Sequence, residues 1–372
     1  MRPLPVLAGF VAGILFPMLV SAQSIRPIAE GPLVVVKDGR YGYINHKGEI
    51  AIQPQFFWAS DFENGFAPVY VCGREVWIDE VGRPVARRSG NSQKLEPRRL
   101  GEKIGFADPA GRFRIRPIFD DVLPFSDGMA AVRVDDLWGF IDSTGYEVIP
   151  PTFKDAFYFL EGVGTAETAD GPVLIDRTGK TIASGFELTH GIVAEGRVPV
   201  CRNDKCGFLD LLGNIAIPLV YDDVDSFSRG LASVRKGEKW GYIDESGHTS
   251  IPFVYDQAGP FASGLAPVRT GKESGFIDRS GKLAFNLAFQ YAPGFLTGNS
   301  DGLLVAESDV SRFWTDDGSF GYVDTSGKVI WGPTKESPDH APVLGWSEQD
   351  KIASCKGLPQ ALQDAVIHFP QQ

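Results

Sequence analysis

The side chains that could carry out chemistry are few in this sequence of 372 residues, and they are widely separated. The five histidines show neither the His-x-x-x-His nor the His-x-His spacing of a zinc site, and no Cys-x-x-Cys pair occurs. Residues 298–302 match the pattern of a nucleophile elbow, which requires a strand-to-helix turn beneath an α/β sheet. Because the surrounding sequence predicts β-strands, we interpret this match as a coincidence. We expect no enzyme activity, no cofactor and no metal site.

The feature that dominates the sequence is a motif repeated nine times, in which a strand ends in a turn of the form Asp-x-x-Gly, with Asn in the first copy. The Asp side chain can accept hydrogen bonds from the backbone two residues on, and the Gly can take the positive φ of a hairpin. A calcium site is the alternative, but each turn offers one carboxylate and calcium takes roughly six to eight oxygens. The central residues of the copies are spaced by 34, 29, 34, 34, 34, 34, 34 and 46 positions: Tyr43, Trp77, Phe106, Phe140, Leu174, Phe208, Tyr242, Phe276 and Tyr322.

The composition of each repeat predicts strands, although helix-pair repeats also have a period of about 34 residues. Gly and Pro recur where a helix interior would lie, and apolar residues alternate with a period of two. A second hairpin, with a two-residue loop such as Asn203-Asp204 or Gly237-Glu238, precedes each motif. We therefore predict an all-β fold of about nine three-stranded repeats in an open curved array, ending in a short helical C-terminal cap. A closed β-propeller is the alternative, but unequal spacings strain a ring more than a spiral.

The best-preserved copies resemble a known family. Trp138-Gly139 and residues 239–244 (Lys-Trp-Gly-Tyr-Ile-Asp), together with Ile-Pro and Gly-Leu-Ala-x-Val companions, are similar to the WG-repeat family of bacterial β-repeats. The resemblance covers about residues 32–331, although several copies lack the Trp or the Gly. The resemblance implies a repeat architecture in a protein of a kind that is often exported or fused to other modules. It implies no catalytic residues.

The N-terminus predicts export. Residues 1–22 have a basic start, an apolar run and small residues before Gln23, as in a cleaved signal peptide. Cleavage leaves 35 basic and 47 acidic residues, a net charge of −12, which disfavours nucleic-acid binding. We expect a periplasmic or secreted protein, a monomer without a transmembrane segment, with the repeat array at 23–332 and the capping tail at 333–372.

Two irregular stretches are the candidate binding sites, since binding residues concentrate in loops that depart from a rigid scaffold. Residues 286–320 form an expanded unit. The shortened unit, residues 83–103, carries a cationic patch that is either a solvated loop or a contact for an anionic polymer or acidic protein. Its candidate binding residues are Arg83, Arg87, Arg88, Arg98 and Arg99.

These features favour a non-catalytic binding or scaffold module for a protein or an envelope glycan. The alternatives are a cell-envelope hydrolase or hydrolase accessory, which would need convergent acids, a metal cluster or an activated nucleophile, and a structural spacer without a ligand.

The four cysteines predict one disulfide from hairpin geometry. Because the loop Asn203-Asp204 places Cys201 directly opposite Cys206 in a non-hydrogen-bonded pair, their Cα atoms should approach to about 4.5 Å. An oxidising compartment would allow the bond to form. A bond between Cys72 and Cys355 would require the tail to fold back on the second repeat, and the sequence leaves that pairing open.

Overall fold

The computed structural model describes residues 31–62, 65–85, 95–108, 110–189, 192–292, 296–298, 305–336, 355 and 358–368. Within these residues the chain forms nine antiparallel sheets of three or four strands, one two-stranded hairpin and one helix. The predicted signal peptide, residues 1–22, and residues 299–302 of the elbow-like sequence lie outside the described residues.

We number the nine sheets in chain order. Sheets 1 to 3 contain β1 (Leu33–Lys37), β2 (Arg40–Ile44) and β3 (Ile50–Phe56); β4 (Phe66–Val71), β5 (Arg74–Asp79) and β6 (Pro84–Val85); and β7 (Glu96–Leu100), β8 (Lys103–Ala107) and β9 (Phe113–Phe119). Sheets 4 and 5 contain β10 (Asp121–Val122), β11 (Met129–Val134), β12 (Leu137–Asp142) and β13 (Glu147–Phe153); and β14 (Asp155–Leu160), β15 (Val163–Thr168), β16 (Gly171–Ile175) and β17 (Thr181–Ser184).

The second half of the chain repeats the same plan. Sheets 6 and 7 contain β18 (Glu187–Leu188), β19 (Val198–Arg202), β20 (Lys205–Leu209) and β21 (Ile215–Tyr221); and β22 (Asp223–Val224), β23 (Leu231–Lys236), β24 (Lys239–Asp244) and β25 (Thr249–Tyr255). Sheet 8 contains β26 (Gln257–Ala258), β27 (Leu265–Thr270), β28 (Glu273–Asp278) and β29 (Leu283–Asn286), and sheet 9 contains β32 (Val310–Trp314), β33 (Phe320–Asp324) and β34 (Val329–Thr334). The prediction of three strands per repeat is therefore incomplete, because five sheets carry a fourth strand.

The turn chemistry agrees with the prediction. In the turn after β24, one Asp244 carboxylate oxygen accepts hydrogen bonds from the amides of Ser246 and His248, both at 2.9 Å. The Gly247 amide donates to the Asp244 carbonyl, and Gly247 has a φ of 81°. Such an Asp side chain replaces backbone partners that the tight turn cannot supply, and glycine is favoured because a side chain is strained at positive φ.

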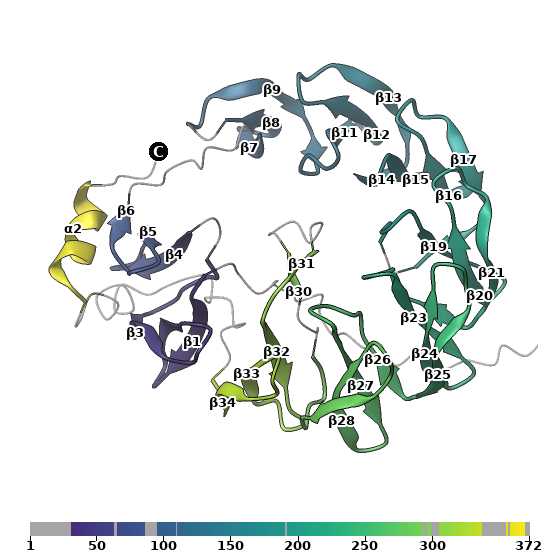
Figure 1. Cartoon of the computed structure of the whole chain (residues 1–372). Coiled ribbons are helices and arrows are strands. Elements are labelled where there is room, and N and C mark those ends of the chain that lie inside the picture. The colour runs from purple at the N-terminus through teal and green to yellow at the C-terminus, as the bar shows by residue number, and fades with distance from the viewer. Residues whose placement is uncertain are drawn as a thin grey trace, which may run out of the picture.

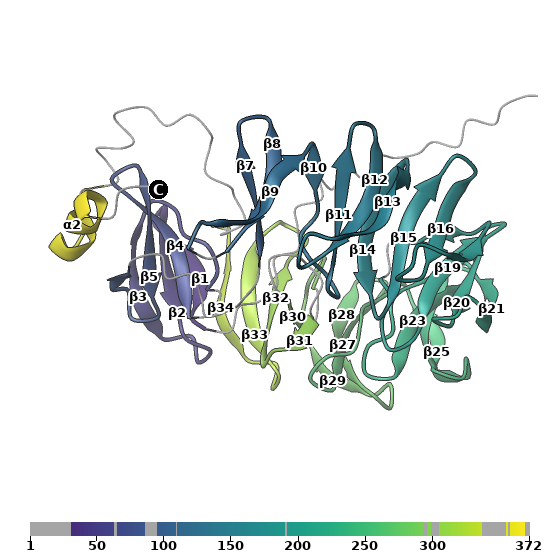
Figure 2. The same ribbon diagram turned by 90° about the horizontal axis from the view of Figure 1, so that it is seen from above.

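The sheets stand side by side around a ring (Figures 1 and 2). Successive side chains of a strand point to opposite faces, and β11 and β23 are each buried at four successive residues, so both faces of these sheets pack against neighbours. Sheets 9 and 1 pack through an apolar cluster that includes Leu33, Val35, Val310 and Tyr322. The predicted open array is therefore not what the structure shows; the sheets adopt the ring arrangement of a nine-bladed propeller, the alternative expectation.

The expanded unit explains why the unequal spacing does not prevent a ring. Part of its extra length forms the hairpin β30 (Leu296–Gly298) and β31 (Val305–Glu307), which points toward the middle of the ring (Figure 1). Insertion toward the centre leaves sheets 8 and 9 in contact, through a cluster that contains Phe276 and Phe313.

Polar contacts also join the two ends of the array. The Tyr322 hydroxyl donates to the Val34 carbonyl at 3.0 Å. The Glu336 carboxylate accepts hydrogen bonds from the amides of Asp38 and Gly39 in the first hairpin, at 3.0 and 2.8 Å. These bonds connect residues almost 300 positions apart, so sheets 9 and 1 close the ring at this seam.

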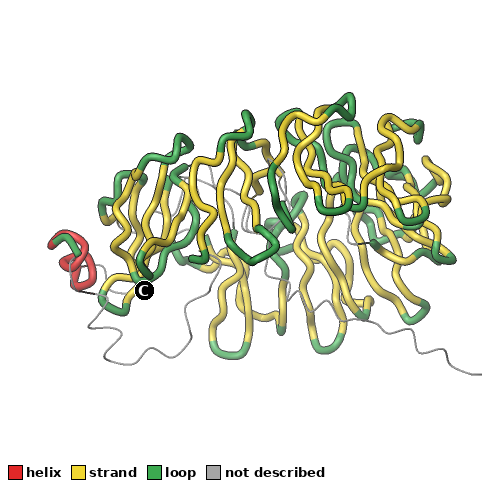
Figure 3. Tube along the Cα trace, turned by 90° about the horizontal axis from the view of Figure 1, so that it is seen from below, coloured by secondary structure: helices red, strands yellow, loops and turns green. Residues whose placement is uncertain are grey.

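The helix α2 (Gln360–His368) lies outside the ring beside sheet 2 (Figures 1 and 3). Leu358 and Leu362 join the apolar cluster of sheets 1 and 2, and Cys355 is disulfide-bonded to Cys72 in the hairpin of sheet 2, with the two Cα atoms 4.6 Å apart. The helical part of the tail therefore packs on sheet 2 rather than on the last sheet. No helix among the described residues is long and apolar enough to cross a membrane.

Candidate functional site: the basic face of sheet 3

One position in the first long strand of every sheet controls packing against the preceding sheet. We call it the inter-sheet position, and it is the residue that pairs with the one just before the central residue of the repeat, as Val132 pairs with Gly139. In eight of the nine sheets this residue is apolar and buried: Val35, Val69, Val132, Ala166, Val200, Val234, Val268 and Phe313.

Sheet 3 departs from this rule. Its inter-sheet position is Arg98, which pairs with Gly105 and is exposed to solvent. Glu96, two residues earlier, replaces the residue that is Ala130 in sheet 4 and Ala232 in sheet 7, both buried. All five residues of β7 are exposed. A guanidinium and a carboxylate are costly to bury without close partners, so this face disfavours packing of the kind that joins the other sheets.

The turn glycines show the same interruption. In the other sheets, the Asp-x-x-Gly glycine lies against the preceding sheet, as Gly145 lies against Ile115 and Gly247 against Ile217. In sheet 3 the corresponding Gly111 instead meets the side chain of Arg98 from its own sheet, whose Nη1 donates to the Gly111 carbonyl at 3.1 Å. Among the described residues, apolar clusters bridge every neighbouring pair of sheets except sheets 2 and 3.

The uncovered face is basic in an otherwise acidic protein, whose net charge is −11. Ile115 in β9 packs toward sheet 4, so its exposed neighbours Arg114 and Arg116 lie on the opposite face, together with Arg98. We call Arg98, Arg114 and Arg116 the basic face of sheet 3. The backbone amide of Arg112 and the guanidinium groups of Arg112 and Arg114 donate to Asp108 and lower the pKa of that carboxyl group.

The structure separates the five candidate arginines of the sequence. Arg98 and Arg99 lie side by side in the sequence of β7, whereas Arg83 follows β5 and donates to Asp79 at 2.8 Å. Arg87 and Arg88 lie outside the described residues. The expectation that Arg98 and Arg99 lie in a loop that departs from the scaffold is wrong, because β7 pairs with β8 in the register of the other hairpins.

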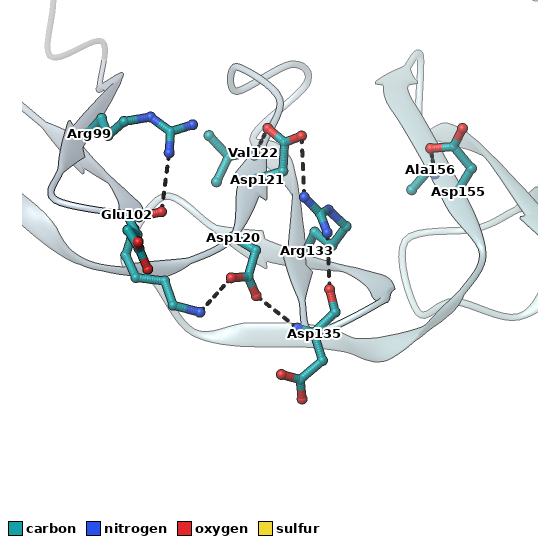
Figure 4. A network of polar contacts seen from close by, with 10 residues as sticks. Arg99, Glu102, Asp120, Asp121, Val122, Arg133, Asp135, Asp155 and Ala156 are labelled. Atoms are coloured by element: carbon teal, nitrogen blue, oxygen red, sulfur yellow. Dashed lines mark hydrogen bonds and ion pairs between the residues drawn. The ribbon is translucent and has the colours of Figure 1, made fainter.

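A repeated carboxylate contact, which the sequence reasoning missed, joins successive sheets near this site (Figure 4). Asp120 accepts hydrogen bonds from Lys103 Nζ of sheet 3 at 2.6 Å and from the Asp135 amide of sheet 4 at 2.9 Å. These two donors lower the pKa of Asp120. The same contact recurs twice, with Asp222 between Lys205 and the Gly237 amide, and with Asp256 between Lys239 and the Gly271 amide. We call Asp120, Asp222 and Asp256 the latch aspartates.

In sheets 4 and 7 the arginine of the hairpin also meets an acid. Arg133 donates from Nη1 to the Asp135 carbonyl at 3.2 Å, and its Nη2 lies 3.8 Å from Asp121 (Figure 4). Arg235 and Asp223 repeat this pair at 3.6 Å. Arg133 pairs with Trp138, and Arg235 pairs with Trp240, across these hairpins. The guanidinium groups, however, bond to carbonyls and carboxylates.

The predicted cysteine pair is present. Cys201 pairs with Cys206 across the hairpin of β19 and β20, the two residues are disulfide-bonded, and their Cα atoms lie 3.9 Å apart. Nearby, a cavity of about 300 Å³ between sheets 5 and 6 is lined by apolar and uncharged polar residues, including Phe157, Tyr158 and Leu188. None of the described residues that line it carries a carboxylate, imidazole or thiol. Among the described residues, no three His, Cys, Asp or Glu side chains converge as a metal site would require.

Comparison with known proteins identifies the repeat. The family model described as "WG containing repeat" matches five segments, at residues 41–71, 104–138, 138–167, 207–240 and 240–273. The chain is a WG-repeat protein. The five matches contain the Asp-x-x-Gly turns of sheets 1, 3, 4, 6 and 7. The match that begins at residue 104 includes β9, with Arg114 and Arg116 of the basic face, whereas β7 with Arg98 precedes it. No curated protein matches the sequence.

Solved structures align with this WG-repeat protein at low identity. A crystal structure of the eukaryotic initiation factor aligns with a TM-score of 0.52 and 10% identity, covering 80% of this chain and 93% of that one. BamB from Moraxella catarrhalis aligns with a TM-score of 0.39 and 13% identity over 66% of this chain and 86% of its own. Such likeness concerns the arrangement of sheets alone.

Proposed function

We propose that this WG-repeat protein is an exported, non-catalytic binding scaffold that takes an acidic protein partner at the basic face of sheet 3. One observation carries the proposal: Arg98 is exposed at the position that is apolar and buried in the other eight sheets. Because Arg98 does not pack against sheet 2, a polar surface lies between the rigid sheets 2 and 3. Such a surface is suitable for binding a charged partner.

The charge of the surface favours an acidic partner. Arg98, Arg114 and Arg116 are exposed on the basic face, Arg99 is exposed beside Arg98 in β7, and a planar guanidinium can bind a carboxylate through two parallel hydrogen bonds. Because the chain as a whole is acidic, an acidic partner should be attracted to the basic face of sheet 3 and not to the rest of the ring.

Binding to poly-L-glutamate at low and physiological ionic strength tests the proposal. The intact chain should bind at low salt and more weakly at 0.15 M, where exposed charges are screened over about 8 Å. The variant Arg98→Glu/Arg99→Glu should lose most of this binding. Its matched control is Lys236→Glu/Lys272→Glu, which changes the charge equally at exposed positions in sheets 7 and 8.

The control should bind as the unaltered chain does. Equal loss in both double variants would contradict the site, and failure to bind poly-L-glutamate at low salt would contradict the function. A polyuronate that binds at the same arginines while poly-L-glutamate does not would reassign the partner to an anionic envelope glycan.

A further inference from the structure

The inner edges of the sheets show what kind of segment the chain places beside its first long strand. In four sheets, a strand of two residues pairs with this edge: β10 on β11, β18 on β19, β22 on β23 and β26 on β27. In sheet 4, Asp121 pairs with Arg133 and Val122 with Val132. Sheet 7 has the same arrangement, with Asp223 opposite Arg235 and Val224 opposite Val234.

In sheets 4 and 7, two successive acidic residues bind the inner strand to the neighbouring hairpin. The first, Asp120 or Asp222, accepts a hydrogen bond from the first amide of the hairpin loop, at 2.9 Å from Asp135 and 2.6 Å from Gly237. The second, Asp121 or Asp223, faces the hairpin arginine. The inner-strand sequence Asp-Asp-Val therefore places one carboxylate on an amide and one beside a guanidinium, and its valine joins the core.

The strand β7 has the receiving half of this arrangement. Arg99 corresponds to Arg133, and it likewise donates from Nη1 to a loop carbonyl, that of Glu102, at 3.1 Å. Gly101 corresponds to Gly237, and their φ values are 61° and 65°. Within the part of the chain that the structure describes, β7 pairs with β8 alone.

The connection that precedes β7 has the wrong charge for an inner strand of this kind. Residues 86–94 contain Arg87, Arg88 and Lys94 and no acidic residue. They cannot supply the carboxylate pair that Asp120 and Asp121 supply to sheet 4. An acidic segment must therefore come from elsewhere if the arrangement is to be completed.

A proline in β7 does not prevent such pairing. Pro97 lacks an N–H group, and it occupies the position of Ala131 in sheet 4 and Pro267 in sheet 8. In sheet 8 the inner strand is nevertheless present, and the Gly259 amide donates to the Pro267 carbonyl at 2.9 Å. The edge of β7 can accept a strand in the same way.

We propose that the inner edge of β7 binds an extended segment of a partner protein in which two successive acidic residues precede an apolar one. The segment adds a fourth strand to sheet 3, its first acid on the Gly101 amide and its second beside Arg99. Main-chain hydrogen bonds to an exposed edge provide affinity, and the two acids provide specificity. This inference rests on the proposed function and narrows the partner from an acidic surface to one strand motif.

A peptide with the sequence of residues 118–124, Ile-Phe-Asp-Asp-Val-Leu-Pro, is the probe, because it contains β10, the inner strand of sheet 4, and both acids. One control peptide replaces both acids with Asn. A second keeps the acids but carries N-methyl groups at the positions of Asp120 and Leu123, whose amides donate to β11 carbonyls at 2.9 Å. The full chain, Arg99→Glu and the charge control Lys236→Glu are titrated with fluorescein-labelled peptides, and binding is followed by anisotropy.

The unmodified peptide should bind about tenfold more tightly than either control peptide, given two carboxylate contacts and two main-chain bonds. Arg99→Glu should remove this preference, and Lys236→Glu should retain it. Equal binding of the N-methylated peptide would overturn strand addition while leaving the poly-L-glutamate result, and thus the proposed function, intact. No binding of the unmodified peptide to the full chain, or equal loss in both variants, would also overturn it.

Discussion

The inter-sheet position offers the clearest test of how the ring is held together. We predict that Val234→Arg lowers the free energy of unfolding by at least about 3 kcal/mol. Val234 is 0% exposed and lies in a cluster with Phe208 and Ile217 of sheet 6. Loss of a buried valine side chain costs about 1.5 kcal/mol, and a guanidinium buried without a partner adds several kcal/mol more.

The matched substitution is Arg98→Val, the reverse exchange at the same position of sheet 3. Because Arg98 is exposed, this change should alter the free energy of unfolding by no more than about 0.5 kcal/mol. Urea denaturation followed by circular dichroism and tryptophan fluorescence compares the two variants. A loss below about 1 kcal/mol for Val234→Arg, or equal effects at both positions, would refute the packing argument.

Three further predictions concern turns, disulfides and pH. Gly247→Val should destabilise the protein by about 1 to 3 kcal/mol and Ser246→Ala far less, because Gly247 has a φ of 81° and an added Cβ would lie 3.1 Å from Ile217; equal thermal shifts would refute the turn assignment. Mass spectrometry of unreduced, alkylated periplasmic protein should find Cys201 joined to Cys206, and free thiols at both positions would contradict either the hairpin or export. Since the folded latch aspartates have lowered pKa values, their contribution to stability is present above the unfolded pKa of about 3.9 and is lost as pH falls through the folded values. The urea midpoint should therefore fall below about pH 4, and by less in a variant with Asn at all three positions; an equal fall in that variant would show that the latches contribute nothing.

The local elements were predictable because their determinants are close in sequence. The Asp-x-x-Gly turns and the Cys201–Cys206 register each depend on fewer than ten consecutive residues. The closed ring was only the alternative expectation, because its closure depends on contacts such as that of Tyr322 with Val34, which are 288 positions apart. The unequal spacing of the repeats suggested that a closed ring would be strained. In the structure, however, part of the extra length of the expanded unit forms a hairpin that points toward the middle of the ring (Figure 1).

The basic charge of the candidate site was predictable from the sequence, but the position of its residues in the sheet was not. The excess of arginine in residues 83–103 is visible in composition, but the short spacing made Arg98 look like a loop residue. Alignment of the copies on Gly105 would have placed Arg98 opposite it, at the position of Val132 and Val234. The latch aspartates also had a signal, the recurring pair Asp-Asp at 120–121 and 222–223, whose partners lie on different sheets and so could not be named from sequence.

Hydrogen exchange with and without poly-L-glutamate tests most directly whether the basic face of sheet 3 is the binding surface. In the unbound chain, amides of β7 should exchange faster than those of β23, because β7 is exposed throughout whereas four residues of β23 are buried. With poly-L-glutamate, protection should rise in residues 95–100 and stay unchanged in residues 231–236. Unchanged exchange in residues 95–100, or an equal rise in both segments, would contradict the account.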